Sequence, residues 1–330
     1  MGRLDPPDVV RKEERMNGPG IETLFADPPA VFNGTRIGLV THAASLCGGG
    51  QHAASVMARH PELDLRVLFA PEHGFAATAG AGEKVGDMVH STLGLPIRSL
   101  YGEFRKPTPE MLADIDVLVV DLQDLAVRCY TYASTLDLVM EAAVEAGLPV
   151  VVCDRPVPVP GLVDGPMLDP DCMSFVGRVP TPYCFGRTQG ELAHLLVREK
   201  YRELDLTVFG LTDGPAAPWV PPSPGIRSWE TAVAYPATVF CEALPAFDVD
   251  RTGLIPFQVW TASFLQAAAY AKAMNARELA GVFFEPYGGI GEGVRLCVHD
   301  AHAFRPAATA VHLMAVAQEQ AGSDALWEAK

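Results

Sequence analysis

The sequence predicts an α/β fold in which a mostly parallel sheet is followed by a smaller α+β unit. In the first part of the 330 residues, short and nearly continuous Val, Leu and Ile runs alternate with helical patterns, which is typical of a parallel sheet covered on both faces. The segment "DGPAAPWVPPSPG", residues 213–225, is rich in proline and glycine and reads as an ordered loop or linker. We therefore expect an N-terminal tail over residues 1–25, a first domain over 26–211 and a second domain over 212–330.

The expected elements of the first domain are strands and helices in alternation. Its strands are the apolar runs in "TRIGLVTHAAS", "LRVLFA", "DVLVVDLQD" and "LPVVVCDRP". Helices are expected in "GQHAASVMARHP", from Thr108, from Ser134 as N-cap to Gly147 as stop, and after Thr188, where Glu191 completes capping-box spacing. In the second domain we expect helices in "FLQAAAYAKAMNARELAG" and "AATAVHLMAVAQEQ", with "VFFEPY" and "VRLCVHD" as strands joined by a glycine-rich hairpin or loop.

Composition narrows the possible partners. A net charge of −15 and a pI of about 5.0, with no run of Lys and Arg, argue against nucleic acid and against an anionic membrane surface. The first 20 residues contain no apolar core of a signal peptide, and no apolar run approaches the roughly 20 residues that span a bilayer. Seven scattered cysteines, never paired as C-x-x-C, favour buried thiols in a reducing compartment. We expect a cytoplasmic protein.

Polar residues follow each of four expected strands. The run Leu65–Ala70 ends at Pro71, which cannot donate to a sheet ladder, and Gly74 permits a tight turn just beyond it. Ligands of open α/β sheets bind outside the carboxyl ends of the strands. The candidate site residues at these ends are His42; Glu72 and His73; Asp121, Gln123 and Asp124; and Asp154 and Arg155.

Two carboxylates that flank a cleft are suited to general acid and base chemistry. Arg128, Tyr130 and Tyr132 follow the Asp121 strand end, so we expect them to line the same edge. A nicotinamide-binding G-x-G-x-x-G turn is absent between the first strand and the first helix, and no Walker A, H-E-x-x-H or G-x-S-x-G motif occurs.

The sequence gives less support for metal binding or for a cysteine nucleophile. His42, His73, Asp121 and Asp124 are residue types that bind metals, but their spacing in the sequence is not diagnostic of a metal site. Cys129 and Cys153 lie in or beside apolar runs, which favours inert buried thiols. We expect neither a metal nor another cofactor.

Several long segments resemble one family. "LFAPEHGF", "SLYGEFRKPTPEML", "IDVLVVDLQDLAVRCYTYASTL", "VVVCDRP", "SFVGRVPTP", "TQGELA" and "WVPPSPG" occur in the order found in exo-β-N-acetylmuramidase (NamZ-type) glycoside hydrolases. The resemblance runs from Ile37 to beyond Phe257. It implies a Rossmann-like catalytic domain, a smaller second domain, a cleft between them, and removal of terminal N-acetylmuramic acid from peptidoglycan fragments without a nucleotide. The family's proposed catalytic glutamate corresponds to Glu72.

The chain departs from this family pattern in three places. Phe185 stands where members have a histidine, and Val157 replaces the asparagine of D-R-P-N-P. The family's E-G-T-N-V-S-E-G-R-G-T-T-x-P-F stretch has become "EALPAFDVDRTGLIPF", which keeps Glu242 and Arg251 but lacks the asparagine and the second glutamate. These departures are consistent with a changed substrate or with lost hydrolysis.

The expected function is a glycosidase-like hydrolase that acts on an amino sugar or a related glycoside, as a divergent member of that family. Glu72 would protonate the leaving oxygen, and Asp121 or Asp124 would orient water or stabilise an oxocarbenium-like charge. The substrate would be a small glycoside whose carboxylate pairs with an arginine. The expected substrate-binding residues are His42, His73, Gln123, Arg128, Tyr130, Tyr132, Asp154, Arg155, Glu242 and Arg251.

Two alternatives stay open at this point. One is a non-hydrolytic sugar-binding or regulatory descendant of the same fold. The other is a transferase that depends on a nucleotide sugar.

Overall fold

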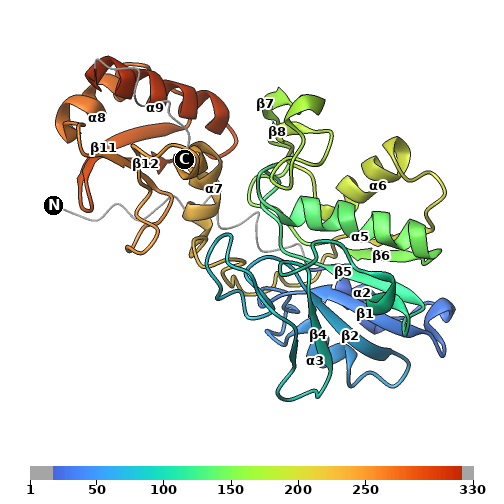
Figure 1. Ribbon diagram of the computed structural model, residues 1–330. Coiled ribbons are helices and arrows are strands. Elements are labelled where there is room, and N and C mark those ends of the chain that lie inside the picture. Colours follow the sequence, from blue (N-terminus) through green and yellow to red (C-terminus); the bar gives the residue numbers. More distant parts are fainter. Residues whose placement is uncertain (1–17, 322–330) are drawn as a thin grey trace. The chain divides into compact units, whose positions relative to one another are not determined.

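Residues 18–321 are described by the computed structural model, in which the chain folds into two compact units (Figure 1). The first unit contains the chain up to Pro160 together with Leu168–Pro180 and Arg187–Pro224. The second contains Gly161–Met167, Thr181–Gly186 and the chain from Gly225 onward. The expected domain bounds at residues 26–211 and 212–330 stay predictions.

The first unit is built on a seven-stranded sheet that is parallel except for β3 at one edge. Its strand order is β3-β4-β2-β1-β5-β6-β9, so the expected mostly parallel, Rossmann-like sheet is confirmed. The strands are β1 (Arg36–Thr41), β2 (Asp64–Ala70), β3 (Met88–Val89), β4 (Pro96–Ser99), β5 (Val117–Asp121), β6 (Val150–Cys153) and β9 (Leu206–Phe209).

This strand order reverses direction at the centre of the sheet. From β1 the chain moves outward through β2 to β4, and it then returns to β5 on the other side of β1 and moves outward through β6 to β9. Ligands bind at such a reversal point, outside the carboxyl ends of the strands. The ends of β1, β2, β5 and β6 therefore share one edge around the reversal.

Helices cover both faces of this sheet (Figure 1). Leu39 and Val119 belong to the core cluster that includes residues of α2 and α3, while α5 and α6 contact β5, β6 and β9. The helices are α2 (Ile21–Ala26), α3 (Ala53–Met57), α4 (Pro109–Leu112), α5 (Tyr132–Ala146) and α6 (Gln189–Glu199), with 3-10 turns η2 (Ala30–Phe32) and η3 (Pro170–Cys172).

Residues 1–17 of the expected tail lie outside the described residues. The rest of it is folded, because α2 begins at Ile21 and its side chains Ile21 and Leu24 are fully buried. The Gly20 N–H also donates to the carbonyl of Asp154 at 2.8 Å. Residues 21–25 therefore belong to a buried helix, and the expected tail boundary at residue 25 stays a prediction.

Two helix starts were predicted from capping patterns, with different outcomes. Thr188 and Glu191 form the expected capping box at the start of α6. By contrast, α5 begins at Tyr132 with Thr131 as N-cap, so the prediction of Ser134 as N-cap is wrong. Helix α5 ends at Gly147 as expected, in the left-handed conformation that glycine tolerates best.

The second unit is a smaller α+β structure around a three-stranded antiparallel sheet in the order β10-β12-β11. Trp260, Tyr270 and Phe304 are fully buried in it. The expected helices and strands of this part are confirmed, including the hairpin that joins β11 to β12. The elements are β7 (Asp164–Met167), β8 (Pro182–Cys184), α7 (Trp229–Thr238), η4 (Val239–Glu242), β10 (Val259–Ala262), α8 (Ala267–Asn275), β11 (Val282–Gly288), β12 (Glu292–Val298) and α9 (Pro306–Ala321).

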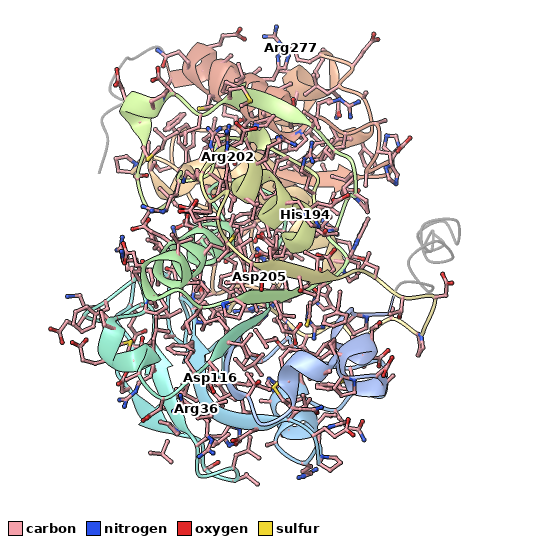
Figure 2. The ribbon with its side chains drawn as sticks, turned by 90° about the vertical axis from the view of Figure 1, so that its right-hand side faces the viewer. Arg36, Asp116, His194, Arg202, Asp205 and Arg277 are labelled. Atoms are coloured by element: carbon pink, nitrogen blue, oxygen red, sulfur yellow. The ribbon has the colours of Figure 1, made fainter. Side chains whose placement is uncertain are left out.

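At the amino edge of the first unit's sheet, Arg36 is paired with Asp116. Figure 2, in which both residues are labelled, shows them next to each other. The guanidinium donates to the two carboxylate oxygens at 2.9 and 2.7 Å, and the Arg36 N–H adds a third bond at 2.9 Å. This pair ties the start of β1 to the start of β5 while remaining open to solvent.

Candidate active site

The strand β2 leads into a tight turn that presents Glu72. The Gly74 N–H closes this turn on the carbonyl of Pro71 at 3.0 Å, and both His73 and Gly74 have left-handed backbone conformations, with φ of 71° and 75°. A positive φ is costly for histidine, so other contacts must hold it in place. The His73 Nδ1 donates to the carbonyl of Ala79 at 2.8 Å, and the His73 carbonyl accepts from two N–H groups of the same loop.

The loop that follows His73, which includes Ala79 and Gly82, also contacts Glu72. The Gly82 N–H donates to Glu72 Oε1 at 2.9 Å, and the Thr131 hydroxyl donates to Oε2 at 2.7 Å. The Tyr101 hydroxyl also hydrogen-bonds the Glu72 side chain. Glu72 is buried, with 7% of the residue exposed, and its carboxyl is held by one backbone N–H and two hydroxyls.

Asp121, the last residue of β5, forms a buried ion pair with Arg155. The Arg155 Nε and Nη2 donate to the two Asp121 oxygens at 2.6 and 2.9 Å, and Nη1 donates to the Leu46 carbonyl at 2.8 Å. Exposure is 0% for the side chain of Asp121 and 2% for that of Arg155. The two strand ends that the sequence predicted to meet are therefore joined to each other.

Asp124 anchors the turn that follows β5. Its Oδ1 accepts from the Leu125 and Ala126 N–H groups at 2.6 and 3.2 Å, and its Oδ2 accepts from the Gln189 side-chain amide. The Ala126 backbone is left-handed, with φ of 56°, and the two bonds to Oδ1 stabilise that conformation. Burial raises the pKa of Asp124 to about 6, against the hydrogen bonds that favour its charged form.

His42, just beyond β1, is a neutral and fully buried imidazole. Burial, followed by the charge of Arg155, lowers the pKa of His42 well below its usual value. Its Nε2 accepts from the Gln123 N–H at 3.0 Å, so the ring carries its proton on Nδ1 and donates to the Tyr132 hydroxyl at 3.3 Å. The Tyr132 hydroxyl in turn donates to the Pro222 carbonyl at 2.7 Å.

Tyr130 and Tyr132 pack edge to face, with ring centroids 4.8 Å apart. Solvent reaches 5% of Tyr130 and none of Tyr132, so neither ring exposes a face on which a sugar could stack. Burial raises the pKa of both hydroxyls, which stay protonated. The tyrosines are instead part of the buried interior of the first unit, and Arg128 is half-buried in the segment that precedes them.

Gln123 and Asp154 also connect neighbouring elements. The Gln123 side chain donates to the Pro156 carbonyl at 2.8 Å, which ties the segments after β5 and β6 together. Asp154 accepts from the Thr188 hydroxyl at 2.9 Å and from the Gly190 N–H at 2.6 Å, so it stabilises the start of α6. A Cβ on Gly190 would lie 2.8 Å from both Asp154 oxygens, and this close approach requires glycine.

The second unit contains a pocket of about 390 Å³ that one of its two candidate residues lines. Arg251 lines this pocket and pairs with Glu242 at 3.1 Å, both side chains being partly exposed. Phe185, where the family pattern has a histidine, is buried.

Three partners of Glu72 were not among the predicted site residues: Tyr101, Thr131 and Gly82. They come from three different loops, separated from Glu72 by 10 to 59 positions, and no sequence pattern links them. The only available signal was the family-like segments "SLYGEFRKPTPEML" and "CYTYASTL", which contain Tyr101 and Thr131.

Among residues 18–321, no three His, Cys, Asp or Glu side chains come together as a metal site. In the same part of the chain, no helix is both long and apolar enough to cross a bilayer.

Comparison with family models covers almost the whole of both units. The model described as "Exo-beta-N-acetylmuramidase NamZ, N-terminal" matches residues 37–230, and its C-terminal counterpart matches residues 233–330. The chain belongs to the NamZ family. Glu72 and the strand-end residues lie in the NamZ N-terminal region, whereas Glu242 and Arg251 lie in the NamZ C-terminal region.

Individual relatives agree with this membership. The chain is 36% identical, over 89% of its length and 76% of the other protein, to the peptidoglycan β-N-acetylmuramidase NamZ of Bacillus subtilis strain 168. A crystal structure of a DUF1343 family protein from Bacteroides fragilis NCTC 9343 is 31% identical, covers 96% of this chain and 86% of its own, and has a TM-score of 0.86. A second DUF1343 structure from that organism, at 23% identity, shows the same fold with a TM-score of 0.66 over 94% of this chain and 92% of its own.

NamZ membership confirms the family resemblance seen in the sequence. It also confirms the expectation of a glycosidase-like hydrolase that acts on an amino sugar or related glycoside. The roles of the individual site residues stay predictions.

Proposed function

We propose that this NamZ-family protein hydrolyses the glycosidic bond of a terminal N-acetylated amino sugar and that Glu72 is the general acid. The observation that carries the proposal is the set of partners of Glu72 at the end of β2. Its carboxyl follows the end of β2, next to the reversal point of the sheet, and is held by groups that suit a proton donor.

The partners of Glu72 allow it to exist with and without a proton. A hydroxyl can donate to a carboxylate or accept from a carboxylic acid, so Thr131 and Tyr101 can serve both states. The Gly82 N–H can only donate, which keeps Oε1 as an acceptor. The transferable proton therefore belongs on Oε2, where it would reach the oxygen of the leaving group.

Asp121 and Asp124 have different partners, and we assign them a positioning role. Every bond that their carboxylates make comes from a guanidinium, a backbone N–H or an amide NH₂, none of which can accept a proton in return. Asp121 fixes Arg155, and Asp124 fixes the turn after β5. The sequence-based assignment of one of them to the attacking water stays a prediction, to be tested by the same kinetics as Glu72.

The substrate we propose contains N-acetylmuramic acid, the sugar named for the Bacillus subtilis relative. The test uses 4-nitrophenyl β-glycosides of N-acetylmuramic acid, N-acetylglucosamine and glucose with the wild-type protein and with Glu72→Gln. Glutamine keeps the shape of the side chain and its bonds to Gly82 and Thr131 but has no acidic proton. We expect turnover of an amino-sugar glycoside, reduced about 100- to 10,000-fold in kcat by the substitution.

Glu83→Gln is the matched control, because Glu83 lies in the same loop and accepts only from the exposed Gly80 N–H. It should leave kcat unchanged. Tight binding of these sugars without turnover would instead support the non-hydrolytic alternative. Turnover that requires a nucleotide sugar would support the transferase.

A further inference from the structure

Tyr101 connects Glu72 to a cationic and aromatic cluster on the same unit. Tyr101 follows β4, and burial together with the negative charge of Glu72 raises its pKa. The hydroxyl is therefore protonated and bonded to Glu72 at neutral pH. On its other side, the ring of Tyr101 packs against that of Phe175, with centroids 5.6 Å apart.

Arg105 is stacked on both of these rings. Its Cζ lies 5.1 Å from the Tyr101 centroid and 4.3 Å from the Phe175 centroid. The residue is exposed, and no described acidic side chain pairs with it. A guanidinium that stacks through its face leaves its N–H edge free to donate, and a carboxylate is the group that such an edge binds best.

Two of the arginines that the sequence offered for this role already have an acidic partner. Arg155 is buried against Asp121, and Arg251 pairs with Glu242. Exposed apolar residues flank the stacked pair in the sequence: Phe104 precedes Arg105 and is 42% exposed, and Met173 and Val176 lie close to Phe175 in the chain and are 53% and 56% exposed. Exposed apolar and aromatic groups around a cation beside a candidate catalytic carboxyl are typical of a ligand site.

We propose that Tyr101, Arg105 and Phe175, here called the Arg105 platform, bind the carboxylate-bearing sugar of the substrate. The Arg105 guanidinium pairs with the carboxylate, and the Phe175 ring packs on the apolar face of the sugar. Tyr101 links this platform to Glu72, so a sugar bound there lies beside the proposed acid. The inference rests on the proposed function and adds the residues that select an acidic sugar.

Kinetics with two matched substrates test the platform. The 4-nitrophenyl β-glycosides of N-acetylmuramic acid and N-acetylglucosamine differ in the lactyl carboxylate. For Arg105→Ala we expect KM for the first to rise about 10- to 100-fold and KM for the second to change less than about threefold. Arg105→Lys keeps the charge and should recover part of the lost affinity. Phe175→Ala should raise KM for both substrates by a similar factor.

Arg66→Ala is the control, because Arg66 is an exposed arginine of the same unit that is paired with Asp64. It should change neither KM. Equal losses on both substrates for Arg105→Ala, or no loss on either, would overturn the inference.

A binding measurement separates the platform from hydrolysis. Titration of free N-acetylmuramic acid and N-acetylglucosamine into the wild-type protein and Arg105→Ala, followed by calorimetry, requires no turnover. We expect the wild-type protein to prefer the acidic sugar and the variant to lose that preference. A wild-type protein that hydrolyses nothing but shows this preference would contradict the proposed function alone, and a wild-type protein without the preference would contradict the platform.

Discussion

The sheet of the first unit has an Arg–Asp pair at each of its two edges, and the pairs have nearly the same geometry. At the amino edge, Arg36 donates to Asp116 at 2.9 and 2.7 Å, and at the carboxyl edge Arg155 donates to Asp121 at 2.6 and 2.9 Å. The exposed fractions of the side chains are 38% and 42% for the first pair but 2% and 0% for the second.

The difference shows that bond lengths alone do not give the energetic role of an ion pair. The Arg36–Asp116 pair adds little to the stability of the folded state, because both groups stay solvated. At the carboxyl edge, two charges have lost their water, so each depends on the other. Buried polar groups are concentrated at the carboxyl edge, where Glu72, His42 and Asp124 also lie.

The largest expected effect comes from breaking the buried pair. Arg155→Ala leaves the Asp121 carboxylate buried without its counter-charge, which should destabilise the first unit by about 3–5 kcal/mol. Thermal unfolding followed by circular dichroism should show a fall in Tm of roughly 10 °C.

The double variant Asp121→Leu/Arg155→Met sharpens this comparison. Since it removes both charges, we expect it to be more stable than either single variant. A double variant as unstable as the sum of the two single ones would contradict mutual dependence of the pair.

The next effect concerns the pH dependence of Asp124. Because its pKa is about 6 in the folded protein and about 3.9 in an unfolded chain, the folded state binds the extra proton between these values. The stability contributed by this group is therefore full below about pH 4 and is lost as the pH rises to about 6. The loss amounts to at most about 3 kcal/mol.

Asp124→Asn removes this titration. Asparagine can still accept from the Leu125 and Ala126 N–H groups, and its NH₂ can donate to Gln189 Oε1, which has no hydrogen-bond partner among the described residues. The stability of the variant relative to the wild-type protein should rise by up to about 3 kcal/mol between pH 4 and pH 7 in urea titrations. A difference that does not vary with pH would show that Asp124 does not titrate in this range.

The smallest expected effect is that of the exposed pair. The hydrogen bond from Arg36 is the main cause that lowers the pKa of Asp116 to about 2. The stability that Asp116 contributes to the folded state is therefore present above about pH 4 and is lost as the pH falls through 2. Arg36→Ala at pH 7 should lower Tm by no more than about 2 °C, and 1 M salt should remove the difference. A loss as large as that of Arg155→Ala would contradict the contrast between the two edges.

Sequence patterns predicted the parts of this molecule that depend on local chemistry. The apolar runs of β1, β2, β5 and β6 are recognisable because both faces of these strands are buried, and Pro71 marks the end of β2. The shared edge of the candidate residues followed from the parallel arrangement. The start of α5 was misplaced because the Thr131 hydroxyl bonds Glu72 and caps no backbone N–H, so the usual capping signal is absent.

The partners of each side chain could not be predicted, because they depend on tertiary packing. Nothing in the sequence states that Arg155 pairs with Asp121, 34 positions away, or that Arg105 stacks on Phe175, 70 positions away. The tyrosines after β5 were expected to line the edge of the sheet, and the structure buries Tyr132, whose hydroxyl bonds the Pro222 carbonyl. Strand β4 was missed because "PIRS" is short and polar, and with it Tyr101 was missed.

The most direct test of Glu72 as the general acid is the dependence of rate on the leaving group. We would measure kcat/KM of the wild-type protein and Glu72→Gln with aryl β-glycosides of one amino sugar whose phenols range from weakly to strongly acidic. An acid is needed most by the poorest leaving group, so the substitution should cost about 100- to 10,000-fold for the least acidic phenol and less than about tenfold for the most acidic one. A loss of the same size across the whole series would contradict the role of Glu72 as the proton donor.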